Sequence, residues 1–329
     1  MKNKVLVTGA DGFIGSHLVE SLLSKGLNVR AFVYYNSRNS WGWLDRYEES
    51  LPRNLEIFSG DIRDPNGVFE AMLDCEKVFH LAALIGIPFS YHSPDTYLQT
   101  NVNGALNVLQ AARKLNVERV IMTSTSEVYG TGQYLPISED HPIQAQSPYS
   151  ASKIASDMLA SSFFCSFDTP VVIARPFNTY GPRQSARAVI PTIISQLLSG
   201  QTELRLGDVN PTRDFNYVGD TVNGFIALSE CADVIGQTFN FASGKDYSIL
   251  DVAKLLIKII NPQAQIVLDQ QRVRPKNSEV KQLLGNSQKM SSVTGWKSST
   301  ELECGLKKTV EWFRDKRNLS EYKSREYNI

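Results

Sequence analysis

Residues 5–15 read VLVTGADGFIG, an apolar run followed by a turn in which glycine recurs at every third position. Leucine and valine then recur at helical spacing from Leu18 to Leu23, and Gly26 ends the pattern. Glycine lets a backbone approach phosphate groups closely, and the N-terminus of a helix attracts anions. A strand, this turn and a helix in that order therefore predict a binding site for the pyrophosphate of a dinucleotide.

Apolar runs alternate with helical patterns along the first half of the chain. Further buried strands are expected near residues 28–33, 55–58, 78–83, 119–122 and 171–175. This alternation predicts an α/β fold, a Rossmann-type doubly wound parallel sheet, over residues 1–177, with residues 215–245 returning to it. Loops and short helices that carry several arginines predict a smaller C-terminal substrate-binding lobe in residues 178–329. Residues 314–329 are rich in charge and lack an apolar period, so we expect a loose tail there.

The composition of the 329 residues argues against several classes of function. Positive and negative side chains balance at 34 each, so the net charge indicates neither a nucleic-acid nor a membrane partner. No apolar run approaches the ~18 residues of a membrane span, and the chain starts directly with a strand, so we expect a cytoplasmic protein. The four cysteines are scattered like free thiols of a reducing compartment, and the four histidines form no ligand pattern, so we expect no metal.

Two groups of polar residues carry the predicted chemistry. Thr125, Ser126 and Glu127 directly follow an apolar run, which places them at the carboxyl end of a strand, where ligands bind in open parallel sheets. Tyr149 and Lys153 stand four residues apart, on one face of a helix. A lysine ammonium beside a phenol lowers the phenol pKa from its usual ~10, so this tyrosine is predicted to take a proton from an alcohol. A lone Tyr-x-x-x-Lys is more often a solvated helix face, but here it follows the glycine turn and the polar strand end.

Other strand ends supply the remaining predicted cofactor contacts. Asp61 suits an adenine amino group, with Ile62 against the ring. The second strand ends in Asn36, Ser37 and Arg38 instead of the acidic residue that would hold the ribose 2′-hydroxyl of NAD. This pattern points towards NADP, although Arg38 also fits a solvated loop cation, so the predicted cofactor is NAD(P). The predicted cofactor contacts are Gly9, Asp11, Gly12, Phe13, Ile14, Gly15, Asn36, Ser37, Arg38, Asp61, Ile62, Leu81, Ala82, Ala83, Thr100, Thr123, Tyr149, Lys153 and Pro176.

Taken together, these motifs resemble the extended short-chain dehydrogenase/reductase family, and within it the nucleotide-sugar 4,6-dehydratases. The resemblance covers nearly the whole chain and rests on the Gly-x-x-Gly-x-x-Gly turn, the stretch TSTSEVYG at 123–130 and SPYSASK at 147–153. It implies a nucleotide-diphosphate sugar as substrate, NAD(P) that is tightly held and regenerated in each turnover, and a homodimer formed through a four-helix bundle. The loop at 90–91 and the arginine-rich second lobe supply the predicted substrate contacts, which are Ser90, Tyr91, Asn178, Arg187, Arg213 and Arg274.

The resemblance also implies a reaction. Tyr149, with Lys153 and Thr125, removes the proton of the sugar 4-hydroxyl while hydride passes to NAD(P)⁺. The 4-ketone makes the C5 proton acidic, Glu127 takes that proton, water leaves from C6, and hydride returns to C6. The dTDP-glucose dehydratases have an Asp where this chain has Ser126, whereas GDP-mannose dehydratases have serine there. Glu127 is therefore expected to serve as both base and acid.

Three other activities fit the same scaffold. UDP-glucuronate decarboxylases share the sequence TSEVYG at 125–130, whereas a 4-epimerase needs no carboxylate beside Thr125. A silent redox-sensing protein is expected to lose Tyr149 or Lys153, and both are present. Among the dehydratases, residues 36–43 (NSRNSWGW) and 274–280 (RPKNSEV) look most like enzymes that act on nucleotide-linked N-acetylglucosamine in legionaminic acid pathways.

Overall fold

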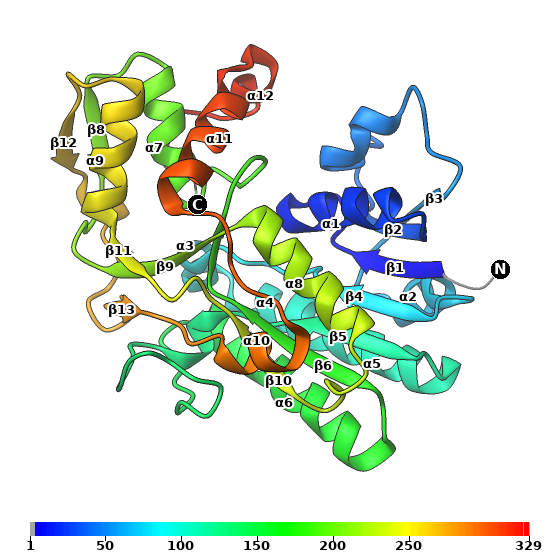
Figure 1. The fold of residues 1–329 in the computed structure, drawn as a ribbon. Coiled ribbons are helices and arrows are strands. Elements are labelled where there is room, and N and C mark those ends of the chain that lie inside the picture. The colour runs from blue at the N-terminus through cyan, green and yellow to red at the C-terminus, as the bar shows by residue number, and fades with distance from the viewer. Residues whose placement is uncertain (1–3, 325, 329) are drawn as a thin grey trace.

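Seven parallel strands form the central sheet of the protein (Figure 1). They are β1 (Lys4–Thr8), β2 (Asn28–Tyr34), β3 (Leu55–Gly60), β4 (Lys77–His80), β5 (Arg119–Thr123), β6 (Val171–Pro176) and β10 (Thr238–Phe241). Their order is β10-β6-β5-β4-β1-β2-β3, which reverses direction between β1 and β4. Ligands bind outside the carboxyl ends of the strands at such a reversal. The predicted α/β fold with a doubly wound parallel sheet is confirmed in this computed structural model, which describes residues 4–324 and 326–328.

Helices cover both faces of the sheet, each over its own apolar cluster. One face carries α1 (Phe13–Ser24) and α8 (Val218–Glu230), and the other carries α2 (Pro65–Met72), α5 (Gly104–Leu115) and α6 (Pro148–Phe167) (Figure 1). Val7 of β1 joins the first cluster and its neighbour Leu6 joins the second. Burial on both faces explains why the strands read as continuous apolar runs instead of alternating ones.

The sequence predicts an amphipathic helix from Asn101 through Leu115, but the helix that leads into α5 begins earlier. A π-helical segment, η2 (Leu98–Asn103), precedes α5, so Asn101 lies inside the helix and does not open it. The buried Asn101 amide bonds to the backbone N and O of Leu84 at 2.8 and 2.9 Å and to the Ser152 hydroxyl at 2.9 Å. π-Helical turns are rare and occur frequently at functional sites. Asn101 thus connects the loop after β4 to helix α6.

A second lobe with its own apolar cluster is built mainly from the later part of the chain. The remaining elements of the protein are η1 (Gly42–Tyr47), α3 (Ile87–His92), α4 (Pro94–Tyr97), η3 (Ser126–Tyr129), β7 (Asn178–Tyr180), α7 (Val189–Leu198), β8 (Glu203–Leu206), β9 (Thr212–Tyr217), β11 (Asp246–Ser248), α9 (Ile249–Ile260), β12 (Gln265–Leu268), η4 (Gln270–Arg272), β13 (Gln282–Leu283), α10 (Gln288–Thr294), α11 (Leu302–Arg314) and α12 (Lys316–Ser320). Strand β9 pairs with β7, β11 and β13, while β8 and β12 form a separate parallel pair. Helices α7, α9 and α11 pack around the cluster.

The end of the chain packs against the second lobe, where the sequence predicted a loose tail. Helix α12 follows α11 directly, and Tyr322 beyond it is buried. The Tyr322 ring lies 4.7 Å from that of Phe313, and its hydroxyl donates to the Gln184 carbonyl oxygen at 2.9 Å. Tyr322 and the partly buried Leu319 supply the apolar contacts that the charge-rich composition concealed. Residues 325 and 329 of the predicted tail lie outside the described residues.

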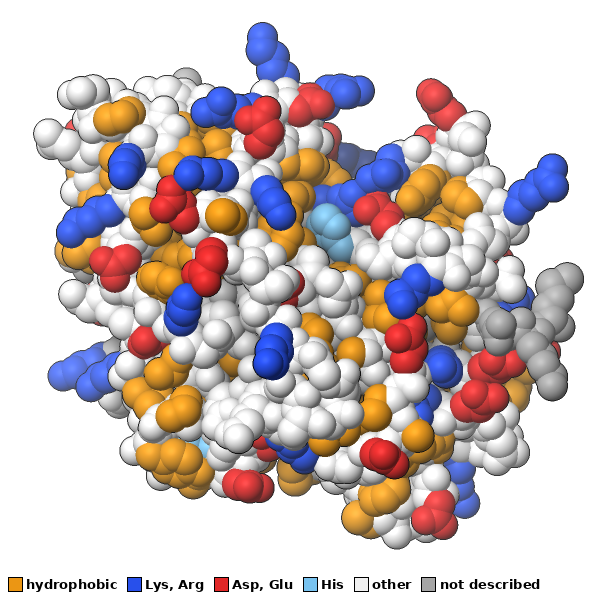
Figure 2. All heavy atoms as spheres, in the orientation of Figure 1, with side chains coloured by type: hydrophobic (Ala, Val, Ile, Leu, Met, Phe, Trp, Pro, Cys, Tyr) orange, Lys and Arg blue, Asp and Glu red, His pale blue; other side chains and the backbone are white. Residues whose placement is uncertain are grey.

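The surface reflects the balanced composition of the chain. Acidic and basic side chains are interspersed over the face that Figure 2 shows. Within residues 4–324 and 326–328, no helix combines the length and the apolar character needed to cross a lipid bilayer.

Candidate active site

The turn between β1 and α1 is a cradle of backbone atoms. A Cβ atom at Gly15 would lie 2.1 Å from the Gly9 carbonyl oxygen, and one at Gly9 would lie 2.8 Å from the Ala82 nitrogen. Among the described residues, no side chain caps α1 at Gly12, so the N–H groups of its first turn, which includes Phe13, stay available to an anion. These residues fit the pyrophosphate of a dinucleotide.

Thr8, at the tip of β1, ties this turn to the neighbouring strand. Its hydroxyl accepts hydrogen bonds from the N–H groups of Leu81 and Ala82, both at 3.1 Å, and lies 2.9 Å from Nδ1 of His80. Burial, reinforced by the positive charge of Lys153, lowers the pKa of His80 to about 3, so the ring is neutral. The neutral His80 ring is therefore held between Thr8 and the buried interior at the end of β4.

The end of β3 carries the residues predicted for the adenine ring. The Asp61 carboxylate pairs with the Arg63 guanidinium, and this hydrogen-bonded pairing lowers the pKa of the Asp61 carboxyl. Ile62 is buried in the apolar cluster beneath α5, and its carbonyl oxygen accepts from the Asn107 amide at 3.0 Å. Asp61 is thus held at the rim of the sheet, close to where the sequence placed the adenine.

The loop after β2 is organised by Asn36. Its amide nitrogen donates to the carbonyl oxygens of Tyr34 and Ser40, and its amide oxygen accepts from the N–H groups of Arg38 and Ser40. Asn36 therefore uses its polar atoms within its own loop. Ser37 and Arg38 are exposed.

The aromatic insertion that contains η1 folds back on the glycine turn. The backbone N–H of Trp43 donates to the Asp11 carbonyl oxygen at 3.1 Å, and the backbone N–H of Tyr34 donates to the Asp11 carboxylate at 3.3 Å. Burial raises the pKa of that carboxyl. The Trp43 ring packs edge-on against Trp312 of α11, with 5.4 Å between centroids. The insertion thus connects the predicted cofactor turn to the second lobe, a role that the sequence did not predict.

The residues predicted for proton transfer meet at the carboxyl end of β5. The Thr125 hydroxyl accepts from the N–H of Glu127 at 3.2 Å and also shares a hydrogen bond with the Tyr149 hydroxyl. Lys153 lies one turn further along α6, and its ammonium donates to the Thr123 carbonyl oxygen at 2.5 Å. Thr125 therefore ties the carboxylate-bearing turn η3 to the tyrosine, while Lys153 ties α6 to β5.

The pKa of Tyr149 moves in the direction opposite to the sequence prediction. Burial raises this pKa, the hydrogen bond from Thr125 opposes the rise, and the charge of Glu127 reinforces it. Burial also lowers the pKa of Lys153 to about 8, against the opposing influence of Asp157. The sequence prediction considered the tyrosine and lysine as a pair, whereas the folded chain also removes both from water. Desolvation favours the neutral form of each.

Two polar atoms near this sheet edge are buried without a protein partner. Oγ1 of Thr123, predicted to contact the cofactor, and Oδ1 of Asn178, predicted to contact the substrate, have no hydrogen-bond partner among the described residues. Buried polar groups are almost always bonded, because leaving one unpaired costs about 1–3 kcal/mol. These atoms therefore fit residues that bond to a ligand. Of the other predicted cofactor contacts, Thr100 lies in η2 and Pro176 ends β6.

Arg213 and Arg274 come together from distant parts of the second lobe. Nη2 of Arg213 and Nη1 of Arg274 lie 3.0 and 3.5 Å from Oε1 of Glu279. Two guanidinium groups around one carboxylate keep a net positive charge, and their planar donors match phosphate oxygens. Sequence reasoning missed Glu279, although its position five residues after Arg274, on the same loop, was a usable signal.

The other predicted substrate contacts differ in their surroundings. The Tyr91 hydroxyl lies 2.6 Å from the Ser278 hydroxyl, which links α3 to the loop that bears Arg274. Arg187 is exposed. Ser90 is fully buried, and its hydroxyl donates to the Ile87 carbonyl oxygen at 2.7 Å, so it is engaged inside α3.

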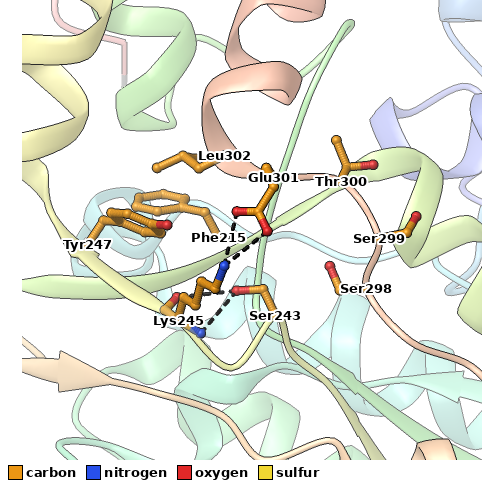
Figure 3. Close-up of a pocket in the computed structure, with 9 residues that line it drawn as sticks. All are labelled: Phe215, Ser243, Lys245, Tyr247, Ser298, Ser299, Thr300, Glu301 and Leu302. Carbon is orange, nitrogen blue, oxygen red and sulfur yellow. Dashed lines mark hydrogen bonds and ion pairs between the residues drawn. The ribbon is translucent and has the colours of Figure 1, made fainter.

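A separate cavity of about 40 Å³ lies where α11 begins (Figure 3). Its lining consists of Phe215, Ser243, Lys245, Tyr247, Ser298, Ser299, Thr300, Glu301 and Leu302. The Lys245 ammonium faces Glu301 across it, with 3.0 Å between Nζ and Oε1 (Figure 3). The volume suits about one water molecule. This lining includes no residue predicted for catalysis or binding, so the candidate active site remains the one at the sheet edge.

Comparison with known proteins decides the family. The sequence profile described as GDP-mannose 4,6 dehydratase matches residues 6–309. The chain belongs to this family. The match extends from the glycine turn through Tyr149 and Lys153 to Arg274 and beyond, so it includes both lobes. The resemblance to the extended short-chain dehydrogenase/reductases is thereby confirmed, whereas the narrower resemblance to enzymes of legionaminic acid pathways stays a prediction.

Similar proteins carry different activities. The UDP-N-acetyl-alpha-D-glucosaminuronate decarboxylase of Bacillus cytotoxicus is 33% identical over 97% of this chain and 100% of its own. The UDP-glucuronic acid 4-epimerase of Bacillus cereus, solved with UDP-glucuronic acid and NAD, is 28% identical with a TM-score of 0.86, covering 94% of this chain and 99% of that one. TunA, an NAD-dependent NDP-hexosamine 5,6-dehydratase of tunicamycin biosynthesis, is 30% identical with a TM-score of 0.83, covering 96% of this chain and 99% of that one. The reaction of this chain therefore has to be inferred from its own residues.

Replacing Gly15 with Ala is expected to weaken NAD binding roughly 100-fold or more, equivalent to about 3 kcal/mol. The added Cβ would lie 2.1 Å from the Gly9 carbonyl oxygen and force the turn apart. Calorimetric titration with NAD measures the change. Gly86→Ala is the matched control, because its Cβ would meet the nearest atom at an ordinary 3.5 Å. Wild-type affinity in the Gly15→Ala protein would remove the glycine turn from the binding site.

Proposed function

We propose that the protein is an NAD-dependent nucleotide-sugar 4,6-dehydratase, which converts a nucleotide-linked hexose to its 4-keto-6-deoxy form. The observation that carries the proposal is the closeness of the Glu127 carboxylate to Tyr149: its charge raises the pKa of the phenol, and the Thr125 hydroxyl holds the backbone N–H of Glu127. Oxidation of an alcohol needs a base such as Tyr149, but it needs no second carboxylate. A carboxylate close to that base fits the removal of a further proton, the one at C5.

The first half of the proposed reaction is oxidation of the sugar 4-hydroxyl. Tyr149, hydrogen-bonded to Thr125, takes the hydroxyl proton. When bound, NAD⁺ would supply the acceptor for the C4 hydride and the donor of hydride to C6, and its positive charge would favour the phenolate. Lys153 supplies a second positive charge one turn away on α6, which offsets the burial of Tyr149.

The second half is elimination of water across C5 and C6. The 4-ketone acidifies the C5 proton, and Glu127 takes it as the C6 hydroxyl departs. Ser126 stands beside Glu127, but a serine hydroxyl is a weak acid, so we assign the protonation of the departing hydroxyl to the Glu127 carboxyl as well. A proton from solvent then enters at C5 when hydride reaches C6, which balances the loss of one water.

We propose NAD as the cofactor in preference to NADP. Three residues were predicted to bind a 2′-phosphate. The Asn36 amide is engaged within its own loop, so only the exposed Ser37 and Arg38 remain for that role. The epimerase and TunA described above are both NAD proteins. Because the cycle returns the cofactor to its oxidised form, release is not needed between turnovers, and we propose that it stays bound.

We propose that Arg213 and Arg274 hold the pyrophosphate of the substrate. Their guanidinium groups converge on Glu279 and carry the N–H donors that phosphate oxygens accept. The proposed sugar is nucleotide-linked N-acetylglucosamine, which rests on the resemblance of residues 36–43 and 274–280 to enzymes of legionaminic acid pathways.

Decarboxylation of a nucleotide-linked uronic acid is the second candidate, because the Bacillus cytotoxicus relative is similar over its full length. That reaction also begins with oxidation at C4, but the ketone then drives loss of carbon dioxide from C5. Decarboxylases share Glu127, so this residue does not separate the two activities. The stretch SPYSASK at 147–153 resembles the dehydratases, so the dehydratase is the first candidate.

The test of the function is incubation of the protein in D₂O with NAD and, separately, UDP-GlcNAc, GDP-GlcNAc, GDP-mannose, dTDP-glucose and UDP-glucuronate. We expect one sugar to give a product that has lost one water and carries deuterium at C5. Mass spectrometry and NMR identify the product. Loss of carbon dioxide would establish the decarboxylase instead, and an unchanged mass with inverted C4 would establish an epimerase.

Glu127→Gln is expected to slow elimination of water about 10²- to 10⁴-fold, the usual loss when a positioned proton-transfer group is removed. Oxidation at C4 should persist, because Tyr149 and Thr125 remain, so NADH absorbance should accumulate during a single turnover. Glu118→Gln, on the exposed end of the loop before β5, is the matched control and should match the wild-type protein. Undiminished water loss in Glu127→Gln would exclude Glu127 as the C5 base.

We also propose that the protein is a homodimer formed through a four-helix bundle of α5 and α6 from each copy. Met158 and Phe167 of α6 are 48% and 43% exposed, which leaves apolar surface for a partner helix. Met158→Asp is expected to halve the mass measured by light scattering, while Leu268→Asp, on the exposed β12, should leave it unchanged. A wild-type protein that is monomeric at all concentrations would refute the dimer.

A further inference from the structure

A buried charged network of Lys153, Asp157 and Arg175 lies beside Tyr149, and the proposed reaction uses only Lys153 of these three. Helix α6 carries Tyr149, Lys153 and Asp157 at intervals of four residues, on one face. Lys153 and Asp157 are 5% and 2% exposed, and Arg175 of β6 is 3% exposed. Each buried charge costs several kcal/mol unless it is paired and hydrogen-bonded. The cost of burying these three charges therefore has to be offset by hydrogen bonds and by ion pairing within the network.

Asp157 fastens α6 to two strands. Its Oδ2 accepts from Nε and Nη2 of Arg175 at 3.1 and 3.0 Å and from the Ser124 hydroxyl at 2.8 Å. Ser124 follows the last residue of β5, Thr123, whose carbonyl oxygen accepts from Lys153. Burial raises the pKa of Asp157, and the Arg175 guanidinium and the Ser124 hydroxyl oppose that rise. With three donors on one oxygen, the carboxylate stays ionised.

Arg175 continues the network to the turn that carries Glu127. Its Nη1 donates to the Tyr129 hydroxyl at 2.9 Å, and its guanidinium lies 5.0 Å from the centre of the Tyr129 ring. Tyr129 in turn donates to Oδ1 of Asn240 at 2.7 Å. Tyr129 is the last residue of η3, so the ion pair reaches from the tyrosine helix to the turn of the proposed C5 base.

We propose that Asp157, held by Arg175, is a positioning residue that keeps the Lys153 ammonium charged and fixes α6 against the turn that bears Glu127. Asp157 acts through Lys153 and Tyr149 and does not itself contact the substrate. The inference rests on the proposed roles of Tyr149 and Lys153. It holds equally for a dehydratase, a decarboxylase or an epimerase, since all three begin with oxidation at C4.

Other titratable groups surround Lys153 and Asp157 and also bear on the pH dependence of this site. They are Tyr149 on the same helix, His80 on β4, Tyr97 on α4, Arg175 on β6, and Glu127 and Tyr129 on η3. His80 is neutral and Arg175 is charged throughout the working range of pH. Burial raises the pKa of Tyr149 and lowers that of Lys153, and the charge of Asp157 raises both. Removing that charge therefore lowers both.

Asp157→Asn is expected to move both limbs of the pH–rate profile to lower pH by about one unit. Lys153 is charged below its pKa of about 8, so the wild-type protein loses this charge as the pH rises through that value, and the variant loses it earlier. Asp157→Glu should restore the limbs. Ser124→Ala, which removes one hydrogen bond and keeps every charge, should leave them in place. A slower Asp157→Asn protein with unmoved limbs would show a structural role only and overturn the proposal.

A second variant covers the case in which unpaired Arg175 prevents folding. Asp157→Asn combined with Arg175→Gln removes both buried charges and is expected to shift the limbs in the same direction. The pKa of Lys153 is also measurable without substrate, by NMR titration of protein labelled with [ε-¹³C]lysine, with Lys153→Arg to assign the signal. An unchanged Lys153 pKa in these variants overturns the proposal. A lowered pKa in a protein that converts no nucleotide sugar would sustain it and refute the proposed function.

Discussion

Charge buried at the tip of β5 is the constraint on which the rest of the site depends. Lys153, Asp157 and Arg175 are almost excluded from water, so each has to find its hydrogen bonds within the protein. Those bonds set the distance of α6 from β5 and β6, and thereby the position of Tyr149 over the sheet edge. After β1, two strands away from β5 in the sheet, the glycine turn acts by shape, because its backbone atoms leave no room for a Cβ at Gly15.

The features that the sequence predicts are those that depend on neighbours along the chain. The glycine turn, the apolar strands and the pairing of Tyr149 with Lys153 are local patterns, and the structure contains each of them. The features it misses join distant segments. Arg213 and Glu279 are 66 residues apart, and their contact exists only because β9 and the loop before β13 lie together. No local pattern signals such a pair.

Three incorrect expectations have one physical cause. The helix start at Asn101, the loose tail after residue 314 and the lowered pKa of Tyr149 were all judged from composition or short spacing. Each is decided by burial, which only the folded chain defines. Asn101 is drawn into a π-helical turn by bonds to Leu84 and Ser152, and desolvation of Tyr149 outweighs the hydrogen bond that it receives. The pattern of polar residues in a sequence therefore identifies which side chains belong to a site better than it identifies whether they are charged.

The indole pair of Trp43 and Trp312 has a kinetic consequence. The ring contact joins the insertion over the glycine turn to α11. The backbone N–H of Trp43 also donates a hydrogen bond to the carbonyl oxygen of Asp11 in that turn. If the second lobe moves away from the sheet, the two indole rings separate and the glycine turn is pulled at the same time. If a dinucleotide binds in this turn as proposed, its release is coupled to the Trp43–Trp312 contact as well as to the phosphate cradle. In the proposed arrangement the second lobe would then retain the cofactor as well as bind the sugar.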